Sequence, residues 1–297
     1  MRAFEYFTAT DSRHAVALLA EHAPARVLAG GTDLLADLKS SPSHAPKTVV
    51  DISRASDMRK IELNERGLCI GALVTHTEIM DSKLIAGLFP ALVDAAHTIG
   101  AVQTRNLGTL AGNLVTAVPS VDSGPTLVAL DAQVVIAGVN GNRQIALAEF
   151  FVGPRKTALQ PDELLVEIVI PKENLDKPAH FLKFGLRKGQ ALALVNAASS
   201  LRIDAKKNTC RDVRIVLGAV APTVVRAHSA EKFLEGRAAT PENFAEAGRR
   251  AVDDVRPISD MRASAEYRKD LVAVLAKRTL EGACALARAS KQKGVRK

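Results

Sequence analysis

The sequence predicts an α+β protein of two domains, and three observations lead to this. Its 297 residues suggest about two domains, at a prior of roughly one domain per 150 residues. The composition, 47% apolar and 24% charged residues, is that of a folded chain with a buried core. Strand-like and helix-like patterns alternate along the chain, and a charged linker interrupts them near residue 176.

We therefore expect a domain boundary near residue 176. Residues 1–176 form the first domain, with subdomains of about 1–55 and 56–176; residues 177–287 form a smaller sheet-and-helices domain, and 288–297 a basic tail. The charge divides at the same place. The first part has 15 Lys and Arg against 20 Asp and Glu, and the remainder has 25 against 12.

A basic half can bind nucleic acid, a membrane surface or an acidic partner. With no Trp and only 4% aromatic residues, the stacking surfaces of a single-strand binder are scarce. We therefore favour a solvated basic face and expect no nucleic-acid partner.

Local signals place the elements in order. Asp11 or Ser12 can cap a helix that ends near His22, and Thr75 to Glu78 have the spacing of a capping box before another helix. Further strands are expected over 26–29, 48–52, 67–72, 164–170, 191–203 and 213–220, and further helices over 33–38, 90–99, 224–234, 241–255 and 264–287, with a loop over 40–46.

Several classes of function lack support. No stretch approaches the ~18 consecutive apolar residues of a membrane span, and the N-terminus lacks the apolar core of a secretory signal, so we expect a cytoplasmic protein. Cys69, Cys210 and Cys284 lie too far apart for CxxC ligation or a disulfide framework, and we expect no metal site. The GxxxxGK[ST], GxGxxG, HExxH and GxSxG motifs are absent, and each of the seven scattered histidines is interpreted as structural or exposed.

Two glycine loops remain as candidate binding sites. In the first, Val27 to Leu34, a strand turns through Gly30 and Gly31 directly into a helix. Paired glycines let backbone N–H groups approach a ligand, and the helix start adds a positive dipole that suits a phosphate. A plain strand-to-helix turn explains this loop equally well. Asp33 would repel a phosphate, so we expect it to face neutral hydroxyls or a ring, or to cap the helix.

The second loop, Asn106 to Asn113, has small residues between Gly108 and Gly112. Asp122 follows nine residues after Asn113, and its carboxylate can accept hydrogen bonds from ligand hydroxyls. The alternative is that Asp122 caps the helix expected near 125–130. Two such loops in one acidic domain favour a long ligand, such as a dinucleotide, held by backbone groups.

The strings AGGTDLL, GTLAGN with PSVDSGP, FFVGPRKT over 150–157 and PDELL over 161–165 resemble the FAD-binding medium subunit of molybdenum hydroxylases. That family includes the flavin subunits of carbon monoxide, xanthine and nicotinate dehydrogenases. The motifs keep the family's order and spacing over nearly the whole chain. The resemblance implies a two-part FAD-binding domain of the vanillyl-alcohol-oxidase and CO-dehydrogenase flavoprotein type, and a CO-dehydrogenase-flavoprotein-like C-terminal domain.

The resemblance also implies which residues bind FAD. The two loops hold the pyrophosphate, Asp122 binds hydroxyls, Leu165 contacts the flavin and Lys183 reaches it from the C-terminal domain. Ile99 stands where some relatives have an aromatic residue, and Ala111 replaces a commoner glycine, which requires a negative φ. The full predicted set is Val27, Leu28, Ala29, Gly30, Gly31, Thr32, Asp33, Leu34, Ile99, Thr109, Leu110, Ala111, Gly112, Asn113, Asp122, Leu165 and Lys183, with no catalytic acid or base.

In such a family the chain carries electrons. A small subunit with [2Fe–2S] clusters and a large molybdopterin subunit are the implied partners, in a dimer of heterotrimers. The flavin passes the electrons to an external acceptor, and the charge division is expected to help the subunits dock. Two alternatives stay open: a self-sufficient FAD-dependent oxidoreductase, and a non-catalytic basic adaptor that keeps the loops only for structure.

Overall fold

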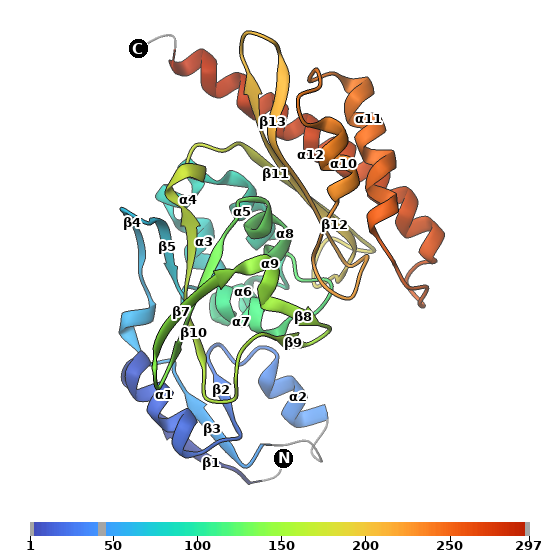
Figure 1. Cartoon of the computed structure of the whole chain (residues 1–297). Helices are drawn as coiled ribbons and strands as arrows, with labels where there is room; N and C mark the ends of the chain where they lie inside the picture. The colour runs from blue at the N-terminus through green and yellow to red at the C-terminus, as the bar shows by residue number, and fades with distance from the viewer. Residues whose placement is uncertain (1–2, 41–45, 295–297) are drawn as a thin grey trace.

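The computed structural model describes residues 3–40 and 46–294, and its N- and C-terminal parts lie at opposite ends of the molecule (Figure 1). The described residues form sheets of three, five, four and two strands. Residues 41–45, which make up most of the loop expected over 40–46, lie outside the described residues. The mixed helices and strands confirm the predicted α+β class.

The first subdomain is a three-stranded parallel sheet. Its order is β1 (Glu5–Thr8), β3 (Thr48–Asp51) and β2 (Ala25–Leu28). Parallel neighbours need crossover connections, and α1 (Ser12–Glu21) and α2 (Leu34–Ser40) lie in them. Asp11 caps α1, since its carboxylate accepts from the His14 N–H at 2.8 Å, as the sequence predicts.

The second subdomain is a five-stranded antiparallel sheet, and a run of short helices separates its strands in the chain. The sheet order is β4 (Ile61–Asn64), β5 (Gly67–Gly71), β10 (Leu164–Pro171), β6 (Gln133–Gly138) and β7 (Gly141–Ala146). The helices between β5 and β6 are α3 (His76–Asp81), α4 (Lys83–Leu88), α5 (Pro90–His97), α6 (Val102–Leu107), α7 (Leu110–Thr116) and α8 (Ser123–Ala129). The connection back to β10 contains α9 (Leu147–Phe150) and the small pair β8 (Phe151–Gly153) and β9 (Lys156–Thr157). The capping box that begins α3 at Thr75 is confirmed.

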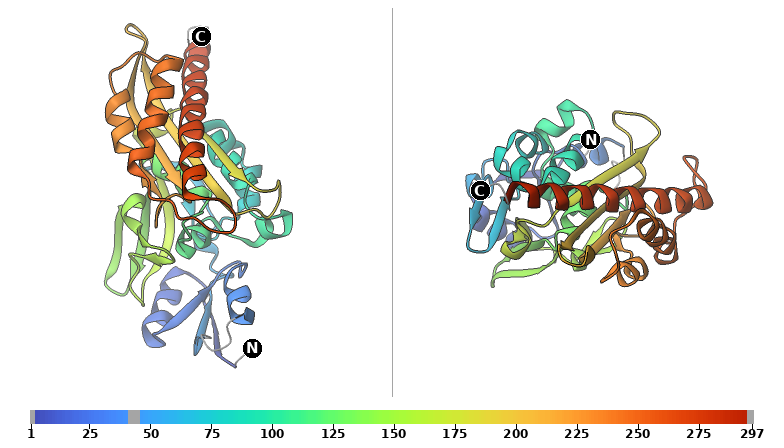
Figure 2. Two further views of the ribbon diagram at one scale, coloured as in Figure 1. Left: turned by 90° about the vertical axis from the view of Figure 1, so that its right-hand side faces the viewer. Right: turned by 90° about the horizontal axis from the view of Figure 1, so that it is seen from above.

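The C-terminal part is a four-stranded antiparallel sheet with helices on one face (Figures 1 and 2). The strands are β11 (Ala179–Gly185), β12 (Ala193–Asp204), β13 (Thr209–Gly218) and β14 (Val225–Arg226), and the helices are α10 (His228–Leu234), α11 (Pro241–Arg250) and α12 (Ala265–Gly294). The long helix α12 packs along β11 and β12, while α5 and α8 of the first domain contact the sheet as well. This sheet and its helices share a hydrophobic core of their own.

Three expected helix bounds in this part are wrong. The helix expected over 224–234 begins only at His228, because Val225 and Arg226 pair with β13. The helix expected over 241–255 ends as an α-helix at Arg250 and continues as a 3₁₀ turn. Helix α12 runs on to Gly294, beyond the expected 287. No helix of the described residues, α12 included, is long and apolar enough to cross a membrane.

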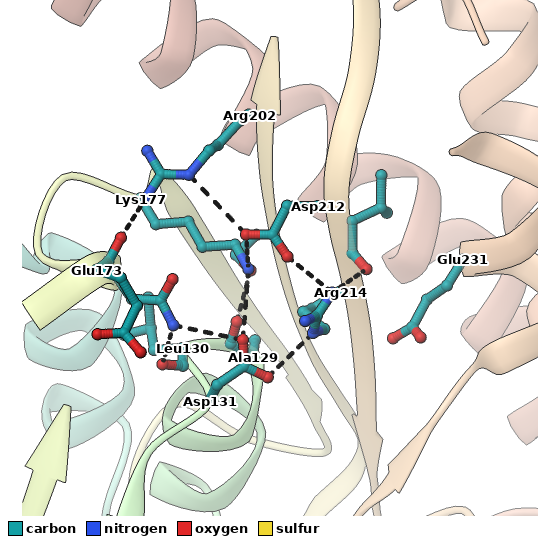
Figure 3. Close-up of polar contacts among 12 residues, drawn as sticks. Ala129, Leu130, Asp131, Glu173, Lys177, Arg202, Asp212, Arg214 and Glu231 are labelled. Atoms are coloured by element: carbon teal, nitrogen blue, oxygen red, sulfur yellow. Dashed lines mark hydrogen bonds and ion pairs between the residues drawn. The ribbon is translucent and has the colours of Figure 1, made fainter. Parts of the chain in front are cut away.

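Five charged side chains join the two parts of the chain (Figure 3). The fully buried Lys177 ammonium lies 2.9 Å from Asp212 and 3.7 Å from Asp131. Arg214 contacts both carboxylates, at 3.0 Å from Asp131 and 2.9 Å from Asp212, and Arg202 lies 3.9 Å from Asp212. Because Asp131 precedes β6 and both arginines stand on the C-terminal sheet, this cluster fixes one part against the other.

Candidate cofactor site

A cavity of about 680 Å³ lies where the two subdomains and the C-terminal sheet meet. Most of its wall comes from the first glycine loop, the segment 108–122 around the second loop, residues 159–165 at the start of β10, and the 190–192 segment between β11 and β12. The backbone N–H of Gln190 donates to the Gly100 carbonyl at 3.1 Å, which ties the C-terminal segment to the helical segment. The volume is in the range of small-molecule and cofactor sites.

The two glycine loops touch each other at the base of this cavity. A Cβ atom on Gly30 would lie 1.8 Å from the Leu107 carbonyl oxygen, so a larger residue cannot stand there without moving backbone. Gly31 has a φ of +71°, a conformation that side chains rarely adopt. The first loop is therefore shaped by its contact with the second loop as well as by the turn into α2.

The second loop leads into α7. Thr109 caps this helix, since its hydroxyl accepts from the Gly112 N–H at 3.0 Å. Asn113 accepts from the Ser123 hydroxyl at 2.7 Å, which links the loop to the start of α8. Ala111 lies inside α7 with the negative φ that its substitution for glycine requires.

Asp122 does not act as the helix cap that the sequence left open. Although it stands at the N-cap of α8, its side chain makes no capping bond within the described residues. Its carboxylate instead accepts from Lys183 Nζ at 2.5 Å and from Asn196 Nδ2 at 2.8 Å, both on the C-terminal sheet. Burial raises the pKa of Asp122, and the ammonium of Lys183 opposes that rise.

The structure brings most of the predicted residues together. The predicted residues that line the cavity are Val27, Ala29, Gly30, Gly31, Thr32, Asp33, Leu34, Ile99, Thr109, Ala111, Gly112, Asn113, Asp122 and Leu165. The three that do not are Leu28, which lies in β2, Leu110, which is fully buried, and Lys183. Lys183 lines a smaller neighbouring cavity of about 440 Å³, which shares Ala191 with the main one.

The charged groups of the wall are mostly paired. The Asp33 carboxylate lies 3.5 Å from the neutral hydroxyl of Thr116, whose shorter hydrogen bond, at 2.8 Å, goes to the Gly112 carbonyl. Asp37 pairs with Arg155 at 3.2 Å. Since acidic side chains outnumber cationic ones along the wall, an anion bound here depends largely on backbone N–H groups.

The predicted set leaves out a number of lining residues, among them three basic side chains: Arg26, His76 and Arg155. Arg155 lies in the FFVGPRKT block that carried the resemblance, which is a usable signal. His76 was interpreted with the other histidines as structural or exposed. It is the first residue of α3, directly after the capping Thr75, and burial lowers its pKa to about 4 with help from the charge of Arg105.

An α+β domain whose two glycine loops enclose a cavity of cofactor size, closed by a second domain, is suited to bind a dinucleotide cofactor. Comparison with family models agrees: residues 2–173 match the FAD binding domain in molybdopterin dehydrogenase, and residues 180–283 match the CO dehydrogenase flavoprotein C-terminal domain. The chain belongs to the family of FAD-binding subunits of molybdenum hydroxylases. It is an oxidoreductase subunit, and FAD is its cofactor.

Known proteins are similar over nearly the whole chain. The 6-hydroxypseudooxynicotine dehydrogenase complex subunit alpha of Paenarthrobacter nicotinovorans is 32% identical over 290 residues, 97% of each chain. The xanthine dehydrogenase FAD-binding subunit of Escherichia coli O157:H7 is 32% identical, with 95% of this chain and 96% of that one covered. The structure of carbon monoxide dehydrogenase from Hydrogenophaga pseudoflava, in a form lacking the Mo-pyranopterin moiety of its molybdenum cofactor, matches with a TM-score of 0.91 at 31% identity, covering 96% of this chain and 98% of that one. The resemblance and the predicted fold are therefore confirmed.

Proposed function

We propose that this chain is the FAD-carrying electron-transfer subunit of a multi-subunit molybdenum hydroxylase. It takes electrons from the [2Fe–2S] clusters of a small partner subunit and passes them to an external acceptor. The observation that carries the proposal is the cavity between the two glycine loops, in a chain whose relatives are subunits and medium chains of dehydrogenase complexes. FAD, when bound, supplies the exchange between one-electron and two-electron transfer.

The residues of the cavity fit FAD. The close approach of Gly30 to Leu107 brings the backbones of the two loops together, and free N–H groups of these loops would hold the pyrophosphate. Asp122 would accept hydrogen bonds from hydroxyl groups of FAD with the carboxylate lone pairs that Lys183 and Asn196 leave open. Ile99 and Leu165 provide apolar wall for the ring system. In these assignments the residues of this chain bind and orient the cofactor.

The family to which the chain belongs also suggests its partner subunits. A small iron–sulfur subunit and a large molybdopterin subunit would complete a heterotrimer, and two heterotrimers a hexamer. The net charges of −5 over residues 1–176 and +13 over the rest suit docking by complementary charge. Complex formation should then weaken as ionic strength rises. If it did not change with salt, the charge division would have no part in docking.

An electron-transfer experiment tests the proposal. The FAD-loaded chain is mixed without oxygen with the separately reduced small iron–sulfur subunit of the same organism, and flavin absorption is followed in a stopped-flow instrument. We expect the flavin to bleach with the reduced partner and to stay unchanged with the oxidised one. A flavin that stays oxidised in contact with the reduced partner would overturn the role. Reduction by a small-molecule substrate without any partner would establish the self-sufficient oxidoreductase instead.

A further inference from the structure

His76 is a buried imidazole without a hydrogen-bond partner, and it lines the cofactor cavity. The residue is 2% exposed. Its Nδ1 is shielded from solvent and has no partner, and its ring makes no hydrogen bond within the described part of the chain. Because Nδ1 is sealed, any polar contact that this ring makes with an occupant of the cavity is made through its other nitrogen, Nε2.

The ring lies where the two glycine loops meet. The His76 backbone N–H donates to the Gly108 carbonyl at 3.1 Å, which holds the start of α3 against the second loop. A Cβ atom on Gly108 would lie 3.5 Å from His76 Cδ2 and 3.6 Å from Thr32 Oγ1. The ring edge that carries Cδ2 also carries Nε2, so this edge and the first-loop hydroxyl approach the second loop at one point.

The surroundings keep the imidazole neutral. Burial is the main cause of its low pKa, and the positive charge of Arg105 adds to it. The Arg105 guanidinium already has hydrogen-bond partners, since it donates to the carbonyls of Ile99 at 2.9 Å and His97 at 3.2 Å. A neutral imidazole has one N–H, and because an orphaned buried N–H is rarer than an orphaned acceptor, the proton belongs on Nε2 rather than on the sealed Nδ1.

We propose that His76 donates a hydrogen bond from Nε2 to a phosphate oxygen of the FAD pyrophosphate, at the junction of the two glycine loops. The inference rests on the proposed function, since it takes the loops to hold that group. A hydrogen bond to a charged acceptor contributes about 1.5–3 kcal/mol, which corresponds to roughly a tenfold to hundredfold change in affinity.

Three variants separate this role from a structural one. His76→Leu removes the donor, and His76→Gln restores an N–H at a similar reach. His180→Leu is the control, because His180 is a partly buried histidine whose Nδ1 is likewise shielded and has no partner, and it lies outside the cavity. Thermal unfolding of each variant checks its fold. Equilibrium dissociation constants are measured for FAD and for ADP, which share the pyrophosphate.

We expect His76→Leu to weaken FAD and ADP alike by about tenfold to a hundredfold, and His76→Gln to recover most of that loss. His180→Leu should change neither. Unchanged FAD affinity in a folded His76→Leu chain would overturn the inference, as would a loss confined to FAD, which would place the contact at the flavin end. If the unaltered chain bound neither ligand, the proposed function itself would fail.

Nuclear magnetic resonance of the unaltered chain gives an independent answer even if His76→Leu does not fold. In a chain with ¹⁵N-labelled histidine, the two ring nitrogens report which one carries the proton. We expect the Nε2–H tautomer before and after binding, and a downfield shift of the His76 Nε2 proton when ADP is added. A proton on Nδ1, or an Nε2 signal that ADP leaves in place, would contradict the proposal.

Discussion

Asp122 Oδ2 and Lys183 Nζ lie 2.5 Å apart and join the FAD-binding domain to the first strand of the C-terminal sheet. Their side chains are only 8% and 7% exposed. Lys183 also donates to the Thr98 carbonyl at 3.0 Å, and Asn196 donates to Asp122. Two residues that were predicted separately as cofactor contacts thus form one buried interdomain pair beside the cavity.

This pair should be strongly coupled. Lys183→Met leaves the Asp122 carboxylate buried without its cation, and Asp122→Asn leaves the ammonium without its anion. Each change should cost about 3–5 kcal/mol of unfolding free energy, and the double variant clearly less than the sum. Urea unfolding of the two single variants and the double variant measures the coupling. Additive losses would show that the two side chains act independently.

Gly30 should be intolerant of a side chain. A Cβ on Gly30 meets the Leu107 carbonyl oxygen, so Gly30→Ala must move the loops apart, at a cost of about 1–3 kcal/mol. We expect at least about tenfold weaker FAD binding, measured by quenching of flavin fluorescence. Gly87→Ala is the control, because Gly87 lies in α4 and a Cβ there would contact no described residue within 4 Å. Equal FAD affinity in the two variants would contradict the close approach of the loops.

The buried His76 makes stability depend on pH. Its pKa falls from 6.5 to about 4 on folding, so the folded, FAD-free chain binds fewer protons than the unfolded chain between these values. The contribution of His76 is therefore fully present above pH 6.5 and is lost as the pH falls toward 4, by about 3 kcal/mol in all. The difference in unfolding free energy between the parent and His76→Gln, measured at pH 7.5 and about 4, should shift by that amount. A difference independent of pH would contradict the buried neutral imidazole.

In the charged cluster of Figure 3, loss of a carboxylate should cost more unfolding free energy than loss of the lysine ammonium. Asp131→Asn removes a carboxylate that both Lys177 and Arg214 contact, which leaves these two cations and Arg202 with Asp212. Asn also adopts the positive φ of position 131, so the backbone is not disturbed. We expect a loss of about 3 kcal/mol or more in urea unfolding.

Lys177→Met is the matched change at the same cluster. It removes a fully buried cation whose two carboxylate partners both keep Arg214, and it fills the same space with an apolar chain. Its cost should be smaller than that of Asp131→Asn. If Lys177→Met were the more harmful variant, the ammonium rather than the shared carboxylate would hold the two parts together.

Short-range signals were readable in the sequence. Asp11 and Thr75 cap their helices because each side chain accepts from the N–H of the residue three positions later. Gly30 and Gly31 mark a turn because a side chain there would clash with backbone or be strained. The family resemblance then gathered the loops into one site. Most of the predicted residues do line the cavity, although their contacts with FAD stay predictions.

Long-range relationships were not readable. Asp122 looked like a possible cap because its partner Lys183 lies 61 residues away in the sequence. His76 carried no spacing signal, since its meaning comes from Gly108 and Thr32 on two other segments. The first residues of the helix expected over 224–234 pair instead with β13, a tertiary contact that local periodicity does not report.

The most direct test of the central claim is purification of the tagged chain from its native host, with an absorption spectrum and metal analysis of the product. The account predicts flavin in a one-to-one ratio to this chain, together with iron and molybdenum on two co-purifying chains. Flavin on a lone polypeptide that is active without partners would contradict it, as would a colourless chain that does not take up added FAD.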